Sequence, residues 1–280
     1  MNKPFQMPCA WKLIRCCVSL VTALLLSVHA GGAGQASGPL PKVLFFANPM
    51  KSDNDVIRRA DPNELSVAER HFRALSEGVF DVTITQDGAE LGSRAKLDRY
   101  QALVFFTAGN PPGVDVDAVV AWVREGGAFI GIHSASNTYQ RHPGYGEMLG
   151  ARYDRRPWRT AASPQTRVRI KVDAPRHPAV QSFPSVFEFA DDIYQFKDFD
   201  RGKFTLLLSL DPASLDLTEP KLNRDDTVFP MAWSKSYGRG RVFYTALGDW
   251  EPTWSDPRYR EHLVAGIRWA LQSRETADRN

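Results

Sequence analysis

The sequence has almost no cysteine, and the little it has lies at one end. Of the 280 residues only Cys9, Cys16 and Cys17 are cysteines, and all three fall in a segment that we expect to be removed. The rest of the chain is therefore expected to contain no disulfide, no thiolate metal site and no cysteine nucleophile. A fold without such cross-links depends on its core.

Acidic residues are absent from the first 30 positions. Lys3, Lys12 and Arg15 precede an apolar run over 18–28, which has about half the length that a membrane-spanning helix needs. We expect residues 1–30 to be a secretory signal peptide cleaved near Ala30, followed by a linker over 31–41. The prediction is an exported protein, periplasmic or extracellular, with no membrane segment after cleavage; the alternative is an uncleaved anchor.

An excess of charge of either sign is also absent once residues 1–30 are set aside. The whole chain has 35 Lys and Arg against 32 Asp and Glu, and removing Lys3, Lys12 and Arg15 leaves 35 − 3 = 32 against 32. The only dense basic cluster spans 152–159. Nucleic acid is therefore not expected as a partner, and the oligomeric state is left open.

Short apolar runs alternate with helical patterns through the first half of the chain. Such alternation is typical of βαβ crossovers and of a doubly wound α/β sheet covered by helices on both faces. The predicted strands are 42–47, 80–85, 102–107 and 128–132, and the predicted helices are 63–77 and one capped by Asp115.

The second half of the chain is expected to be richer in β-structure. Residues 167–172 alternate polar and apolar side chains, residues 204–210 form a buried run, and 231–234 and 241–245 flank Gly238-Arg-Gly240 as a hairpin. A helix over 257–271 follows. We predict one domain over 42–272, a surface excursion over 211–227 and a polar tail over 273–280.

The turn after the fourth strand reads Gly131-Ile132-His133-Ser134-Ala135. Ligands of open α/β sheets bind beyond the carboxyl ends of the strands, and small residues on either side of a polar one are typical of a strand-to-helix elbow. His133 is therefore the candidate acid or base, exposed on a rigid elbow, with a purely structural histidine as the alternative. Neither Ser134 nor Ser136 is at the centre of a Gly-x-Ser-x-Gly elbow, which disfavours a serine hydrolase.

Further candidates lie beyond the elbow. Asp191, Asp192 and Tyr194 place carboxylates and a phenol close together, suited to binding vicinal hydroxyls or supplying a base; a solvated strand end is the alternative. Trp250 and Trp254 follow the last strand in a predicted loop, where indoles can stack on a sugar ring. The remaining candidates for substrate binding are Ser134, Asn137, Arg156, Trp233 and Asp249.

Five blocks in order resemble the ThuA-like (trehalose utilisation) family, whose fold is similar to that of class I glutamine amidotransferases. They are GIHSASNT (131–138), YGEMLGARY (145–153), DDIYQF (191–196), PMAW (230–233) and GRVFYTALGDW through IRWA (240–270). The resemblance implies a flavodoxin-like, mostly parallel sheet with the elbow where an amidotransferase carries its cysteine. It also implies carbohydrate metabolism, associated with trehalose and its keto-derivatives.

Positions that match the family pattern are His133, Asp191, Tyr194, Trp233 and Gly248. Three positions depart from it. Asp192 stands where members usually have glutamate, Arg156 replaces the histidine of a Phe-x-x-His-Pro block, and Asp249 replaces the histidine of a Leu-Gly-His block. Since arginine is a permanent cation and no metal ligand, we expect Arg156 and Asp249 either to form an ion pair across the site or to face solvent.

These observations predict an exported protein that handles a small carbohydrate, a disaccharide or keto-sugar, through isomerisation, elimination or hydrolysis. A cysteine-dependent amidotransferase is excluded. A metal-dependent hydrolase is disfavoured because His133 has no histidine partner at ligand spacing, so we expect neither metal nor cofactor. The alternative is a non-catalytic carbohydrate-binding or scaffold protein with a degenerate site.

Overall fold

The computed structural model describes residues 38–50, 55–160, 165–223 and 225–277, with side chains as far as Gln272. All elements named below lie within the unit Pro39–Asn280. The predicted signal peptide and most of the predicted linker lie outside the described residues. Within the described ranges, no helix is long and apolar enough to span a bilayer.

A nine-stranded sheet with the order β2-β1-β3-β4-β11-β10-β9-β6-β7 runs through the unit. Its first five strands are parallel to one another, and all of them except the edge strand β2 are almost wholly buried. They are β2 (Asp81–Thr85), β1 (Lys42–Asn48), β3 (Ala102–Thr107), β4 (Ala128–Ile132) and β11 (Gly240–Thr245). The four strands predicted for this half of the sheet are confirmed to within one residue at each end.

The other four strands extend the sheet in antiparallel fashion. They are β10 (Pro230–Tyr237), β9 (Thr205–Leu210), β6 (Thr166–Val172) and β7 (Val186–Asp191). The predicted hairpin is present as β10 and β11. In β6 the alternation predicted from sequence is observed, because Val168 and Ile170 are buried while Arg167 and Arg169 are exposed.

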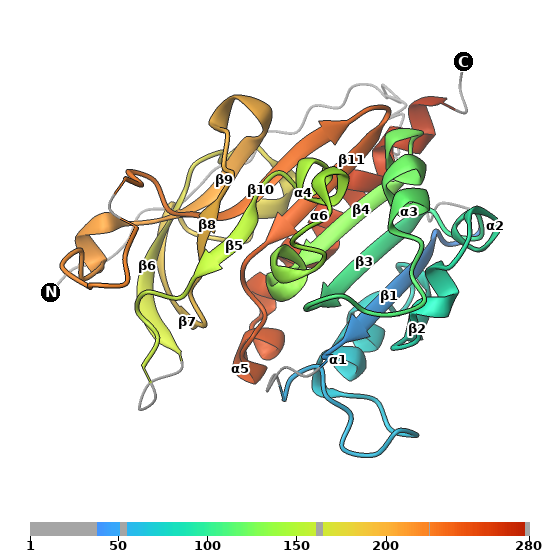
Figure 1. Cartoon of the computed structure of the whole chain (residues 1–280), viewed down its shortest axis with the longest axis horizontal. Helices are drawn as coiled ribbons and strands as arrows, with labels where there is room; N and C mark the ends of the chain where they lie inside the picture. Colours follow the sequence, from blue (N-terminus) through green and yellow to red (C-terminus); the bar gives the residue numbers. More distant parts are fainter. Residues whose placement is uncertain (1–37, 51–54, 161–164, 224, 278–280) are drawn as a thin grey trace, which may run out of the picture. The chain divides into compact units, whose positions relative to one another are not determined.

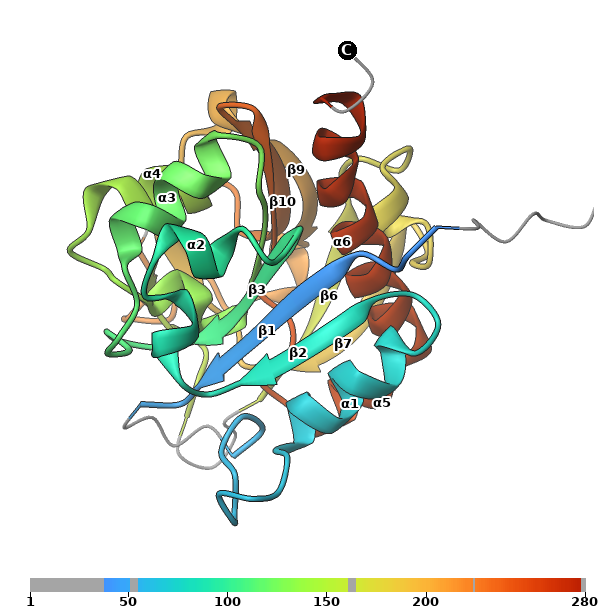
Figure 2. The same cartoon turned by 90° about the vertical axis from the view of Figure 1, so that its right-hand side faces the viewer.

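Helices cover both faces of the parallel half (Figures 1 and 2). On one face α6 (Pro257–Ala277) packs on β3, β4 and β11, and α1 (Val67–Ser76) packs on β1 and β2; α5 (Glu251–Ser255) touches both helices. The other face carries α2 (Arg94–Leu97), α3 (Val116–Arg124) and α4 (Pro143–Leu149). The expected two-sided cover of a mixed α/β sheet is therefore present.

Capping side chains are present where helices α3 and α1 begin. Asp115 caps α3 by accepting a hydrogen bond from the Ala118 N–H, as predicted. In α1 a capping box between Ser66 and Glu69 starts the helix later than the predicted residue 63. Helix α6 continues past Leu271 to Ala277, into the segment expected to be a polar tail.

A second, two-stranded sheet was not predicted. It consists of β5 (Arg152–Arg155) and β8 (Gln195–Lys197), and its antiparallel register pairs Tyr153 with Phe196. Because β5 ends just before Arg156 and β8 begins just after Tyr194, this small sheet brings together the two segments that carry the basic cluster and the acidic block.

Five short 3₁₀ turns connect the described elements: η1 (Gly88–Leu91), η2 (His133–Asn137), η3 (Pro178–Val180), η4 (Arg201–Lys203) and η5 (Pro212–Ser214). The last lies in the predicted surface excursion. Turn η2 is the one that carries candidate residues.

One buried histidine of the core makes acid stability predictable. His262 of α6 is fully buried, its Nδ1 lies 2.5 Å from the carbonyl oxygen of Ala179, and burial lowers its pKa to about 4. Between about pH 6.5 and pH 4 the unfolded state therefore binds a proton that the native state does not. We expect the free energy of unfolding to fall by on the order of 3 kcal/mol as the pH drops through this window.

Urea denaturation at a series of pH values measures this loss. In His262→Leu the slope between pH 6.5 and 4 should become shallower, even where the variant is less stable overall. Leu263→Ala, a buried substitution on the same helix that removes no titratable group, is the control and should keep the wild-type slope. An unchanged slope in His262→Leu would show that His262 contributes nothing to acid unfolding.

Candidate active site

His133 lies at a sharp turn directly after β4. It is the first residue of η2, and its φ of 42° places it in the left-handed region, which is uncommon for a residue with a side chain. Gly131, two residues before His133, lets the side chains of Tyr244 and Leu149 pack closely against the strand. A Cβ at that position would lie 2.9 Å from Cδ2 of Tyr244 and 3.0 Å from Cδ1 of Leu149. The elbow predicted from the small residues around His133 is therefore present.

The prediction that the elbow exposes His133 is wrong. The side chain is fully buried, and the ring of Tyr194 lies over it with 4.0 Å between centroids. Its carbonyl oxygen accepts hydrogen bonds from the hydroxyls of Tyr244 at 2.7 Å and Ser136 at 3.0 Å. Segments distant in sequence close over the turn, which local pattern alone did not indicate.

The imidazole of His133 is held in one tautomer. Nδ1 lies 2.7 Å from the carbonyl oxygen of Ala246, and a carbonyl oxygen can only accept, so Nδ1 carries a hydrogen. In the neutral ring Nε2 is then an acceptor. It is buried and has no hydrogen-bond partner among the described residues.

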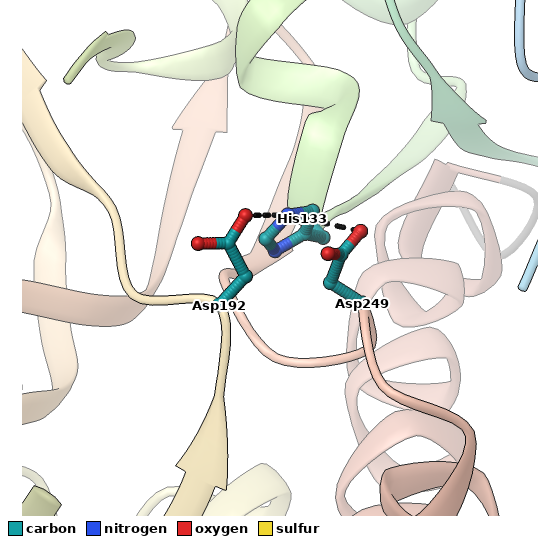
Figure 3. A group of neighbouring side chains, drawn as sticks. All are labelled: His133, Asp192 and Asp249. Carbon is teal, nitrogen blue, oxygen red and sulfur yellow. Dashed lines mark ion pairs between the residues drawn. The ribbon is translucent and has the colours of Figure 1, made fainter. Parts of the chain in front are cut away.

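Two carboxylates face this nitrogen (Figure 3). Nε2 of His133 lies 3.4 Å from Oδ1 of Asp249 and 4.0 Å from Oδ2 of Asp192. All three groups are acceptors when the ring is neutral and the carboxylates are ionised, so their direct approach is repulsive. A proton or a cation among them removes the repulsion, which makes this a site built to hold positive charge.

Asp191 holds the two loops of the site together through hydrogen bonds. Its fully buried carboxylate accepts hydrogen bonds from the backbone N–H groups of Asp192 (2.8 Å), Gly248 (2.8 Å) and Asp249 (3.1 Å), and from the hydroxyl of Thr253 (3.0 Å). One side chain thus fixes both loops that carry the facing carboxylates. Asp191 contributes position, while Asp192 and Asp249 point at His133.

Burial shifts the acidity of several groups at this site. It raises the pKa of Asp191 to about 7, partly opposed by His133 and the backbone N–H donors. Burial also raises the pKa of Asp249, opposed by His133, while nearby Asp192 raises it further. The pKa of the Tyr194 phenol is raised well above its ordinary value for the same reason. The site therefore favours protonated carboxyls more than water does.

Two arginines neutralise the third carboxylate. Nη1 of Arg156 lies 2.7 Å and Nη1 of Arg159 3.0 Å from the same oxygen, Oδ2 of Asp192. The guanidinium of Arg156 also lies over the rings of Tyr153 and Tyr194, at 5.9 and 5.7 Å from their centroids. The predicted alternatives for Arg156, an ion pair with Asp249 or a solvent-facing side chain, are thus replaced by an ion pair with Asp192.

His133, Asp192 and Asp249 form a possible metal-binding set. Each offers one ligand atom, and these atoms lie within 4.8 Å of one another. One nitrogen and two carboxylate oxygens suit several divalent cations. However, Oδ2 of Asp192 already accepts from two guanidinium groups, so a divalent ion would add to two positive charges. The expectation of no metal stays a prediction.

Two of the tryptophans predicted to bind substrate are core residues instead. Trp254 is fully buried in α5 rather than in a loop, and its indole N–H donates to the carbonyl oxygen of Gly248 at 2.8 Å. Trp233 is equally buried and donates to the carbonyl oxygen of Leu149 at 2.7 Å. Neither ring offers a face to a ligand, which corrects the prediction for both.

The remaining candidates lie around the elbow and the last loop. Ser134 is buried, and its hydroxyl has no partner among the described residues. Asn137 is half-buried and its carbonyl oxygen accepts from the Gly109 N–H. Trp250 is half-buried at the start of α5. Sequence reasoning missed Arg159, Tyr244 and Thr253, because no local pattern distinguishes them from ordinary arginine, core or helix residues.

The hydrogen bonds of Asp191 generate a stability prediction. Asp191→Asn puts an NH2 group where an oxygen accepted two hydrogen bonds, so we expect a loss of about 1–3 kcal/mol for each unsatisfied buried group. Thr253→Val, which removes a single donor, should cost less. Urea denaturation of both variants measures the difference.

The same carboxyl should also produce a distinctive pH dependence. The native pKa of about 7 exceeds the unfolded value near 3.8, so between these values the native state alone holds the proton. The stability contributed by Asp191 is therefore greatest at low pH and falls as the pH rises toward 7, with no such decline in Asp191→Asn. A difference between wild type and variant that stays constant from pH 4.5 to 8 would contradict this assignment.

Comparison with known proteins places this geometry in a family. The model of the ThuA family, described as trehalose utilisation, matches residues 48–270. A putative ThuA-like protein from Bacteroides uniformis is similar in structure, with 25% identity, a TM-score of 0.68 and coverage of 85% of this chain and 94% of that one. No protein with a curated description matches the chain.

Two further solved structures share the fold at lower identity. A putative ThuA-like protein from Parabacteroides merdae has 16% identity and a TM-score of 0.61, covering 83% of this chain and 90% of that one. A cytoplasmic protein from Salmonella typhimurium has 14% identity and a TM-score of 0.52, covering 82% and 99%. On the match over residues 48–270, the chain belongs to the ThuA (trehalose utilisation) family, which suggests a role related to carbohydrates.

Proposed function

We propose that this protein acts on a small carbohydrate, a disaccharide or keto-sugar, by proton transfer through the His133–Asp249 pair. The observation that carries the proposal is the convergence of three buried or part-buried acceptors, His133 Nε2, Asp192 and Asp249, on one point. These three acceptors can take up a proton and release it again, as the groups of a general acid–base catalyst must. Family membership supplies the substrate class.

Exposure decides which member of the pair meets the substrate. The side chain of His133 is 0% exposed and that of Asp249 16%, whereas Arg156 and Arg159 are 35% and 37% exposed. Substrate therefore reaches the site from the side of Asp249 and the two arginines. Asp249 is the accessible end of the pair and His133 the buried end that stores the proton.

The proposed step is removal of a proton from the carbon next to a carbonyl group, or from a hydroxyl. The proton passes to the His133–Asp249 pair, and the electrons of the broken bond remain on the substrate. The negative charge then lies on the carbonyl oxygen, as an enolate, or on the deprotonated hydroxyl oxygen. The guanidinium groups of Arg156 and Arg159 lie beside the site and stabilise that charge. Return of the proton to a different atom of the substrate gives an isomerisation. Loss of a leaving group from the neighbouring carbon, with formation of a double bond, gives an elimination.

Exchange of carbon-bound substrate hydrogen for solvent deuterium tests proton removal from carbon directly, because hydroxyl hydrogens exchange with D2O without a catalyst. A panel of disaccharides and their oxidised keto-forms is incubated with the protein in D2O, and incorporation is followed by NMR. We expect His133→Gln and Asp249→Asn each to lower the exchange rate by about 10²–10⁴-fold, the range of general acid–base catalysis. His71→Gln, a half-buried histidine on α1, is the matched control.

Full exchange by His133→Gln would refute the proposal. Metal analysis of the purified protein accompanies the assay, since a stoichiometric divalent ion would indicate metal-assisted chemistry by the same three residues.

A second candidate function is carbohydrate binding without catalysis, favoured by the complete burial of His133. Thermal stabilisation by a sugar, with neither deuterium exchange nor product, would support it. Export after cleavage near Ala30 belongs to the proposal as well; it is supported by the composition of residues 1–30, and N-terminal sequencing of the native protein tests it.

A further inference from the structure

A small cavity lies between the outer strands of the sheet and helix α5. Its volume is about 150 Å³, and its lining includes Phe189, Trp250 and four charged side chains, namely Arg167, Glu188, Asp256 and Arg258. Figure 1 shows α5 beside the end of β7, which forms the other wall. No residue of the His133 cluster lines this cavity.

We propose that this cavity is a subsite for one neutral sugar ring, the second ring of a disaccharide whose reacting ring contacts Asp249. The inference rests on the proposed function for its substrate class. Sites for drug-sized ligands occupy about 300–1,000 Å³, so a cavity of this size holds one ring rather than a whole disaccharide.

Trp250 forms the apolar wall. It is half-buried, and its indole N–H donates to none of the residues that the structure describes. The indole N–H groups of Trp254 and Trp233, by contrast, donate to backbone carbonyl oxygens inside the core. A part-exposed indole with an available N–H can cover the apolar face of a sugar ring and also reach a hydroxyl.

The polar wall is rigid and balanced in charge. Arg258 binds Asp256 through two nitrogens, with Nε 3.0 Å from Oδ1 and Nη2 2.5 Å from Oδ2, and its guanidinium lies over the rings of Phe187 and Phe189. Planar groups fixed in this way bind hydroxyls at low entropic cost.

Arg167 and Glu188 complete that wall. They are 3.8 Å apart and 69% and 63% exposed, which leaves donors and acceptors available for sugar hydroxyls. Two acidic and two basic side chains add up to no net charge. This balance favours a neutral sugar over a phosphate or a carboxylate.

The cavity is joined to the candidate active site by covalent and hydrogen-bonded links. Trp250 directly follows Asp249, so their Cα atoms are about 3.8 Å apart. Thr253, which also lines the cavity, donates its hydroxyl hydrogen to Asp191, the residue that fixes the Asp249 loop. Two residues that line the cavity, Trp250 and Thr253, are therefore directly linked to the segment that holds the carboxylate facing His133.

Titration with trehalose, followed by NMR of the tryptophan indole N–H groups, tests the subsite. The Trp250 signal is assigned by its loss in Trp250→Phe. We expect this signal to shift saturably while those of Trp233 and Trp254 move little. Trp250→Ala should weaken trehalose binding about tenfold, and Arg167→Ala should also weaken it. The fold of each variant is checked by its unchanged thermal midpoint.

The outcome separates the subsite from the proposed reaction. His133→Gln should lose deuterium exchange yet retain the trehalose-dependent shift of Trp250, whereas Trp250→Ala should lose affinity. A Trp250 signal that does not move with trehalose or its oxidised form, or unchanged affinity in both Trp250→Ala and Arg167→Ala, would overturn the subsite while leaving the His133 proposal standing.

Discussion

The hydrogen bond from His133 Nδ1 to the Ala246 carbonyl oxygen is the contact on which the candidate site depends. It is a consequence of strand register. In the parallel pair of β4 and β11, Gly131 lies opposite Tyr244 and Ile132 opposite Thr245, so the next residues along are His133 and Ala246. The sheet therefore selects the tautomer of the imidazole, and through it the atom that meets the carboxylates.

Asp191 plays the complementary part at the end of β7. The central sheet brings β11 and β7 no closer than three intervening strands, yet their following loops meet because one buried carboxylate accepts donors from both. Burying that carboxylate costs free energy, which its raised pKa records. The cost is offset by four hydrogen bonds and by the fixed positions of Asp192 and Asp249.

The charged groups of the site form two sets, one around Asp192 and one around Asp249. Arg156 and Arg159 compensate Asp192, and the remaining carboxylate, Asp249, shares its environment with His133. Asp192, Arg156 and Asp249, the three positions at which the chain is expected to depart from the pattern of the family it resembles, are thus all within this arrangement. Arg156 adds a fixed positive charge to the site, and Asp249 adds an acceptor that faces His133. The substitutions change the chemistry of the site while its residues still converge.

The sequence by itself determined the elements and the candidates for the site. Periods of two and 3.6 residues, the Asp115 cap and the Gly238-Arg-Gly240 turn are local signals, so strands, helices and the hairpin could be predicted closely. The small residues around His133 indicated the elbow, and His133, Asp191, Asp192, Tyr194, Arg156 and Asp249 do converge. The tertiary structure alone decided how these residues pair. Contacts between segments far apart in sequence decide the burial of His133, Trp233 and Trp254, the pairing of β5 with β8 and the partner of Arg156. A local sequence pattern does not indicate which distant segment will pack against it.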